Sequence, residues 1–167
     1  MGFRLGKNKI QKDIIVKTKE ELINIINKRI IDDKGNLDLT DINVSKLSDF
    51  SNLFKNHPDV YEIDLTGWDV SNIENTAKMF SNCTYLKTIK GLEYWDTSSL
   101  KECKFMFCDC INLIDIGHIE NWNIENVEDV NGMFGGCKRL KLDLTNWHIK
   151  RKSNYFNFSP HALNIKY

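Results

Sequence analysis

Large apolar residues return at a nearly fixed interval along most of this chain. Counting from Ile42, tryptophans follow at steps of 26, 27, 27 and 25 residues. These aromatic positions are Trp68, Trp95, Trp122 and Trp147. A second column with the same rhythm consists of Phe54, Phe80, Phe107 and Phe134. Further columns of Val, Leu and Ile keep this register, so the sequence predicts an array of about four structural repeats.

The second unit indicates how polar and apolar positions divide between elements. Ile63 and Leu65 alternate with polar neighbours, which is the period-2 pattern of a half-buried strand. A glycine then permits a turn, and Ser71 stands three residues before Glu74, at the spacing of a capping box. Apolar offsets of three, four and seven positions over residues 73–80 predict a two-turn helix. We therefore expect each unit to contain a strand, a turn and a short helix.

One unit of this size cannot bury its own Trp, Met and Phe side chains, so neighbouring units must stack and share them. The expected fold class is an α/β repeat, a curved leucine-rich-repeat-like solenoid of about four strand-turn-helix units with a parallel sheet. Strands pack about 4.8 Å apart and helices about 8–10 Å apart, so the sheet is expected on the concave side. The units are placed near 38–63, 64–90, 91–116 and 117–142, with a partial unit at 143–148.

Caps are expected at both ends of the repeat array, which spans 38–148. Residues 1–37 form the N-terminal cap, in which a strand precedes an amphipathic helix that runs to about Ile31. Thr18 and Glu21 have capping-box spacing at the start of that helix. After residue 148 the periodicity stops, and the basic, aromatic segment 149–167 is predicted to be either a C-terminal cap or a partner-binding tail.

Charge is unevenly distributed, although the net charge of the 167 residues is zero. Residues 1–31 hold 8 Lys/Arg against 3 Asp/Glu, residues 138–167 hold 7 against 1, and residues 32–137 hold 8 against 19. An acidic middle suits a basic or nucleic-acid-binding protein partner and argues against direct binding of nucleic acid. No apolar segment has the length of a signal peptide or membrane span, so we expect a cytoplasmic protein, at the surface only if an export segment precedes this sequence.

The five cysteines raise the alternatives of a metal site, a disulfide and core packing. Cys103, Cys108 and Cys110 are closely spaced, but Cys110 shares its repeat column with Cys83 and Cys137. Small apolar thiols pack well in cores, so we interpret this column as a structural ladder rather than a metal site. The predicted helix spacing exceeds the Cα separation of about 4.4–6.8 Å that a disulfide tolerates, which argues against a disulfide within the column.

The sequence offers no recognisable catalytic arrangement. The four histidines fall at unrelated phases of the repeat, without a carboxylate or nucleophile at a catalytic offset. No glycine-rich phosphate-binding loop is found. We therefore expect a protein that is not an enzyme and that binds no cofactor and no metal.

Several units share an extended motif. Residues 64–73 have the sequence Asp-Leu-Thr-Gly-Trp-Asp-Val-Ser-Asn-Ile, and residues 79–83 have Met-Phe-Ser-Asn-Cys. Later units keep Trp95-Asp96-Thr97-Ser98 with Met106-Phe107, and Trp122 with Gly132-Met133-Phe134. Over about residues 15–148 this pattern resembles the BspA-like leucine-rich repeats of bacterial surface proteins and mycoplasma lipoprotein-associated proteins, here without their secretion signal. The resemblance implies a parallel-stranded solenoid used for binding and adhesion, with no catalytic motif.

The expected function is that of a protein–protein interaction module that binds its partner through a curved, acidic repeat surface. Outward positions of the strands need not pack into the core, which makes them the predicted contact residues. They are Glu62, Asp64, Thr66, Thr88, Lys90, Asp115, Lys141 and Asp143. Two alternatives stay open: an anti-CRISPR-like inhibitor, encoded by a phage or mobile element, that blocks a bacterial enzyme such as a defence nuclease, and a truncated surface adhesin.

Overall fold

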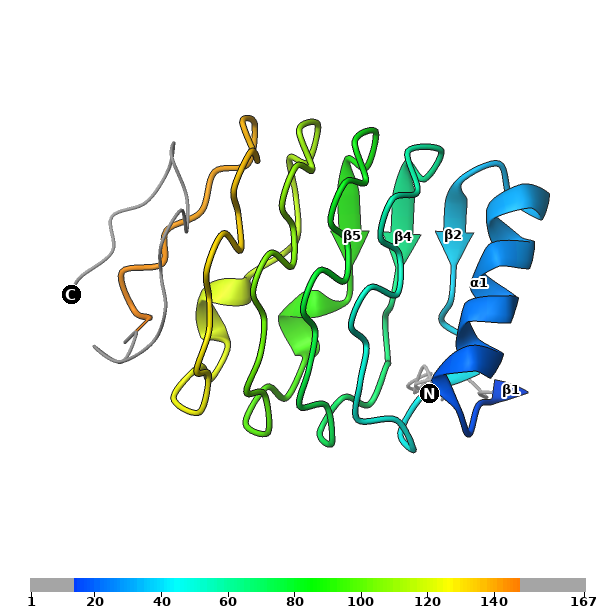
Figure 1. The fold of residues 1–167 in the computed structure, drawn as a ribbon, viewed down its shortest axis with the longest axis horizontal. Coiled ribbons are helices and arrows are strands. Elements are labelled where there is room, and N and C mark those ends of the chain that lie inside the picture. Colours follow the sequence, from blue (N-terminus) through cyan, green and yellow to red (C-terminus); the bar gives the residue numbers. More distant parts are fainter. Residues whose placement is uncertain (1–13, 148–167) are drawn as a thin grey trace, which may run out of the picture.

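The computed structural model describes residues 14–147, which wind through successive coils lying side by side along the longest axis (Figure 1). We use "coil" for each such turn of the chain. The first elements are β1 (Ile14–Ile15), α1 (Lys19–Asp32), β2 (Asn36–Asp38) and β3 (Ile42–Asn43). They are followed by β4 (Glu62–Asp64), β5 (Thr88–Lys90) and two 3₁₀ helices, η1 (Leu92–Tyr94) and η2 (Ile119–Asn121).

Successive coils contribute one strand each to a parallel sheet in the order β2-β4-β5. Ile63 of β4 pairs with Leu37 of β2 and with Ile89 of β5, and all three side chains are buried. A parallel bridge between Thr88 and Asp115 continues the pairing into the next coil. Because the partners are spaced by 26 or 27 residues, the apolar alternation of each strand points the same columns into the core.

The predicted two-turn helix over 73–80 is wrong, because this segment is not helical in the structure. Its backbone amides instead bond to the next coil: Thr76 N–H donates to the Glu102 carbonyl and Phe80 N–H donates to the Met106 carbonyl, both at 2.8 Å. Parallel bridges at equivalent positions link the coils on this side as well. The backbone hydrogen bonds of the segment therefore run between coils rather than along a helix.

Backbone conformation explains why a helical periodicity produced no helix. Lys78 and Asn82 have φ angles of 58° and 62°, which a right-handed α-helix does not contain. The same left-handed conformation occurs at the equivalent positions Asn52, Asn56, Phe105, Asp109, Gly132 and Gly136. Gly, Asn and Asp tolerate that conformation best, and six of these eight positions hold one of them. A turn repeated every four residues thus generates the same apolar spacing as a helical face.

Hydrogen bonding on both sides of the coils removes the reason for the predicted curvature. Away from the strands, the rings of Phe80 and Phe107 have centroids 5.4 Å apart. That distance is close to the strand spacing of about 4.8 Å and well below the 8–10 Å that packed helices require. The concave sheet was predicted from a wider helical side, which the structure lacks in its repeats.

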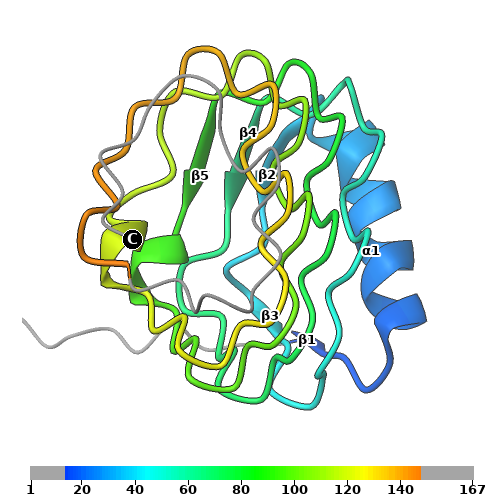
Figure 2. The same ribbon diagram turned by 60° about the vertical axis from the view of Figure 1, so that its left-hand side comes forward.

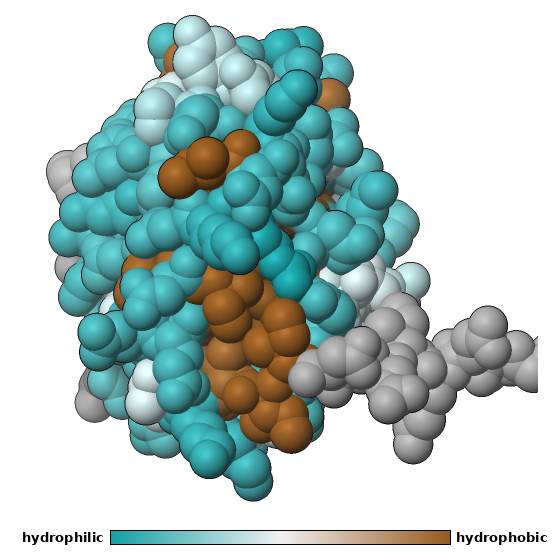
Figure 3. All heavy atoms as spheres, turned by 90° about the vertical axis from the view of Figure 1, so that its right-hand side faces the viewer, coloured by the Kyte–Doolittle hydropathy of each residue, from teal (hydrophilic) through white to brown (hydrophobic). Residues whose placement is uncertain are grey.

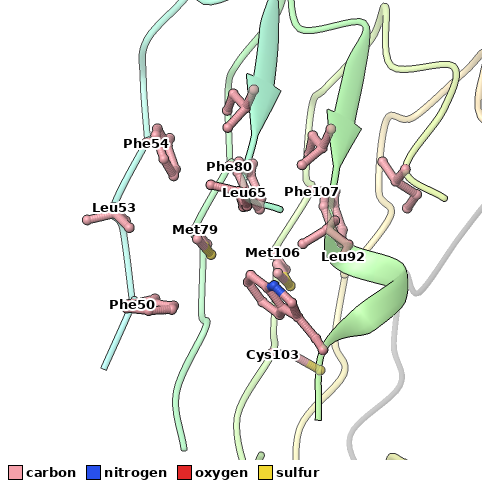
Figure 4. Packing of buried hydrophobic residues seen from close by; sticks show 14 of the residues in the cluster. Phe50, Leu53, Phe54, Leu65, Met79, Phe80, Leu92, Cys103, Met106 and Phe107 are labelled. Carbon is pink, nitrogen blue, oxygen red and sulfur yellow. The ribbon is translucent and has the colours of Figure 1, made fainter. Parts of the chain in front are cut away.

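Ladders of identical side chains run through the core along the stack. The rings of Phe54, Phe80, Phe107 and Phe134 stack with centroids 5.2, 5.4 and 5.4 Å apart and interplanar angles of 6° or less. Figure 4 shows the first three of these on successive coils. Trp122 stacks between Trp95 and Trp147 at 5.8 and 6.3 Å. Each buried aromatic is shared by two coils, so neighbouring coils stabilise one another.

The N-terminal end is closed by β1 and α1, which lie against the first coil (Figures 1 and 2). The capping box is present: Thr18 Oγ1 accepts from Glu21 N–H, and the Glu21 carboxylate accepts from Thr18 N–H. Leu22, Ile26 and Ile30 form the buried face of α1. In residues 14–147 no helix is long and apolar enough to cross a lipid bilayer. Residues 1–13 of the predicted N-terminal cap and the predicted C-terminal cap or tail, 149–167, lie outside the described residues.

Candidate partner-binding surface

The outward side chains of the sheet form two rows across the coils. Glu62 pairs with Thr88, which is bridged to Asp115, while Asp64 pairs with Lys90. All of these predicted contact residues, like Thr66, remain at least partly exposed. The structure therefore brings six predicted residues together on what we call the strand face: Glu62, Asp64, Thr66, Thr88, Lys90 and Asp115.

Sequence reasoning missed the first members of both rows. Asn36 and Asp38 of β2 pair with Glu62 and Asp64 of β4, and both are exposed. The first coil has Ile42 where later coils have tryptophan, so the motif gave no signal for a strand at 36–38. Asn36 and Asp38 therefore extend the strand face by one coil.

The last two predicted contact residues are less firmly connected to this face. Lys141 and Asp143 are exposed, but no strand pairing joins them to Asp115 within residues 14–147. Asp143 Oδ1 accepts a hydrogen bond from Thr145 N–H at 3.1 Å. These two positions follow the shortest step of the repeat, at which the strand pattern ends.

Several carboxylates of the acidic middle hold turns. Asp64 Oδ1 accepts from Thr66 N–H and Asp115 Oδ1 accepts from Gly117 N–H, each at 2.9 Å. The same side-chain turn recurs at other corners of the coils, with carboxylate acceptors Asp38, Asp49, Asp69, Asp96 and Asp129. Hydrogen bonds from Ser98 hold the pKa of Asp96 below its usual value. Much of the central negative charge is therefore explained by turn formation rather than by helix starts.

Tyr94 and His118 lie beyond the strands, in or beside η1 and η2. Tyr94 is 74% exposed, the second most exposed large apolar side chain among the described residues. His118 Nδ1 lies 2.7 Å from Glu120 Oε1, and this contact raises the pKa of His118. Because Tyr94 takes the repeat position of Gly67, no repeated pattern marked it in the sequence.

The cysteine column lies in the core. Cys83, Cys110 and Cys137 donate from Sγ to main-chain carbonyls of the preceding coil at 2.9, 3.0 and 3.0 Å. Burial raises the pKa of Cys83 and of Cys137 to about 12, so these thiols stay protonated. All five cysteines are free, although the wide helix spacing once expected to separate them does not exist. Within residues 14–147, no three His, Cys, Asp or Glu side chains are arranged to hold a metal ion.

A groove of about 570 Å³ opens at the N-terminal end. It is lined by Ile14, Ile25, Lys28, Arg29, Asp32, Asp33, Asp38, Thr40 and Asp41. The Arg29 guanidinium spans part of it, with bonds of 2.8 and 2.7 Å to the Asp41 carboxylate and a third to the Asp38 carbonyl. Figure 3 faces this end, where the exposed isoleucines of β1 and α1, Ile15 and Ile31, also lie. These contacts secure the edge of the sheet, and no described nucleophile lines the groove.

Comparison with known families assigns the chain. A family model described as "Mycoplasma protein of unknown function, DUF285" matches residues 27–91 and 48–166. The chain belongs to this family. The two DUF285 matches overlap, and the second alone covers more than half of the sequence. No curated protein and no solved structure matches the chain.

Proposed function

We propose that this DUF285 chain is a non-enzymatic module that binds another protein through its strand face. The observation that carries the proposal is the in-register exposure of the two rows that Glu62 and Asp64 begin together with Asn36 and Asp38. Core packing does not use these outward side chains, so their identities are free to suit a partner. Adjacent strands about 4.8 Å apart present them on one continuous surface.

We also propose that the fold is a leucine-rich-repeat-like solenoid of the BspA-like kind. One parallel strand per coil, ladders of Phe and Trp, and two overlapping matches to a mycoplasma family support this relationship. In such an architecture each coil contacts only its neighbours, and the strands together present an extended binding surface. The proposed role in binding follows from that surface.

The charge of the strand face favours a basic partner. Asp38, Glu62, Asp64 and Asp115 carry four negative charges on it, against the single positive charge of Lys90. Charge complementarity of this kind mainly increases the association rate and specificity. Tyr94, beyond the end of β5, adds a large exposed aromatic ring of the type that often dominates binding energy.

Affinity purification from the native host, followed by mass spectrometry, tests this function. The informative variant is Glu62→Lys combined with Tyr94→Ala, because neither side chain holds a turn in the described structure. Asp64 and Asp115 are less suitable, since their substitution also removes a turn hydrogen bond. Truncation of a central aromatic contact typically costs about 2 kcal/mol or more, so we expect recovery of the partner to fall at least tenfold.

Glu128→Lys is the matched control, because it makes the same charge change at an exposed position outside the strand face. It should leave recovery of the partner unchanged. Thermal unfolding should be equal for all variants. The strand face is not the binding surface if the double variant recovers the same partner in the same amount as the unmodified chain.

A further inference from the structure

A second surface gathers exposed apolar side chains at another corner of the coils. The segments 58–61, 84–87, 111–114 and 138–141 each lead from the non-strand side toward the strand position of a coil. We call them together the basic corner. Seven large apolar side chains are exposed among residues 14–147, and four lie here: Tyr61, Tyr85, Ile111 and Ile114. They are 39–54% exposed, whereas the tryptophan and phenylalanine ladders are buried.

Hydrogen bonds between coils align these residues. Lys87 N–H donates to the Tyr61 carbonyl and Ile114 N–H donates to the Lys87 carbonyl, each at 2.9 Å. Tyr61, Lys87 and Ile114 therefore form one row across three coils. The Tyr85 ring leans on the Tyr61 ring, with centroids 6.0 Å apart. The apolar groups are consequently neighbours on the surface, as those of a docking site must be.

The charge of this corner is opposite to that of the strand face. Its four segments contain Lys87, Lys138, Arg139 and Lys141 but only one acid, Asp59. Arg139 Nη1 lies 3.4 Å from Asn112 Oδ1, so its guanidinium reaches over the preceding coil. Lys138 and Arg139 are both exposed. The basic groups therefore flank the apolar row rather than being scattered over the molecule.

We propose that the basic corner docks a short acidic protein segment that also carries apolar side chains. Its carboxylates would pair with Lys87, Lys138 and Arg139, while its apolar groups would cover the tyrosines and isoleucines. Burial of exposed apolar area supplies most of the binding free energy, and the charges supply orientation and rate. This surface is distinct from the strand face, and its proposal does not depend on the function proposed above.

The observations favour a protein segment over nucleic acid. Half of the exposed apolar groups are isoleucines, which offer no ring on which a base can stack. A long polyanion would also extend onto the strand face, where Glu62 and Asp115 directly follow Tyr61 and Ile114 in the chain and would repel phosphate. A short acidic peptide meets only the positive charges of the corner.

The test measures binding of a labelled peptide of alternating Glu and Tyr or Leu residues by fluorescence anisotropy. A peptide with Lys in place of Glu, and short oligo(dT), are the comparison probes. We expect saturable binding of the acidic peptide that weakens as salt rises, because exposed charges are screened over about 8 Å at physiological ionic strength. Lys138→Glu with Arg139→Glu should raise its Kd at least tenfold, and Tyr85→Ala should raise it severalfold.

Glu128→Lys again serves as control, since it adds positive charge away from the corner, and it should leave this Kd within about twofold. Circular dichroism and sedimentation velocity accompany each variant. Absence of peptide binding, or equal binding by the Lys138→Glu/Arg139→Glu variant, would overturn the proposal. So would tighter corner-dependent binding of oligo(dT), or a wild-type dimer that the double variant abolishes, since a nucleic acid or a second copy would then be the occupant.

Discussion

Individual indole groups differ in how well their polar atom is satisfied. Nε1 of Trp68, Trp122 and Trp147 donates to a main-chain carbonyl of the preceding coil at 2.9, 2.8 and 3.1 Å. Nε1 of Trp95 is buried without a hydrogen-bond partner among the described residues. A buried unpaired donor costs about 1–3 kcal/mol. Trp95 thus keeps its place through ring packing alone, between Phe50 and Trp122.

This difference makes Trp95→Phe and Trp122→Phe a matched pair. Both remove part of a stacked indole, but only the second leaves the Leu92 carbonyl without its donor. We expect Trp122→Phe to lower the free energy of unfolding by about 1–3 kcal/mol more than Trp95→Phe. Urea unfolding followed by circular dichroism measures both. Equal losses would mean that the indole hydrogen bond does not contribute to the ladder.

Thiol chemistry separates one cysteine from the other four. Cys108 is partly exposed, and its pKa is raised to about 11 by burial and by the neighbouring Asp109 carboxylate. In native protein we expect Ellman's reagent to label Cys108 first, with a rate that increases with pH because the thiolate is the nucleophile. Asp109→Asn should speed the reaction by lowering this pKa, and asparagine accepts the positive φ of 61° at that site. Persistence of the fast phase in Cys108→Ser would assign it to another thiol.

At the scale of an element, the left-handed turns determine the path of each coil opposite the sheet. Gly132 has a φ of 59°, and a Cβ built there would lie 2.5 Å from ring atoms of Phe105 in the preceding coil. Phe105 itself takes this conformation with a φ of 54°. One residue of the pair must therefore be small for two such turns to stack.

Gly132→Ala should consequently destabilise the protein. The added methyl combines overpacking against Phe105 with an unfavourable φ, at an expected cost of about 1–3 kcal/mol in free energy of unfolding. Gly135→Ala provides the comparison, since Gly135 has no positive φ. Thermal and urea unfolding of the two variants should differ clearly. An equally stable Gly132→Ala protein would show that the ring of Phe105 moves aside at no cost.

The sequence predicted the strands better than the segments that follow them. Ile63 and Ile89 alternate with polar residues and recur at the repeat interval, and these two facts suffice to pair β4 with β5. The segment 73–80 was misassigned because its hydrogen-bond acceptors lie 26 residues away, in the next coil, where local periodicity does not report them. Tyr94 was missed for another reason, because a residue that occurs once in an array is invisible to a repeat.

At the scale of the whole molecule, the ends of the stack need protection. β2 is the first strand of its sheet, and one edge carbonyl, that of Asp38, is bound by Arg29 of α1. The same guanidinium makes two bonds to the Asp41 carboxylate. An unprotected edge strand invites pairing with another chain. Arg29 thus ties the terminal helix to the strand edge that it covers.

Arg29→Met keeps much of the aliphatic stem but removes these three bonds. We expect a loss of about 1–3 kcal/mol in free energy of unfolding and a rise in self-association at high protein concentration. Lys28→Met alters an exposed residue of the same groove and should change neither quantity. Sedimentation velocity combined with urea unfolding distinguishes the two. A monomeric Arg29→Met protein of undiminished stability would assign protection of the edge to α1 packing alone.

Main-chain bonding on both long sides has an architectural consequence. Each further 26- or 27-residue segment can join the stack by the same backbone pairing as its predecessor, so duplication of one segment would lengthen the molecule by about one interstrand step, roughly 4.8 Å. Such growth would leave the existing rows of side chains in place. Length and surface chemistry can therefore change independently, and a protein of this design can act as an adjustable spacer.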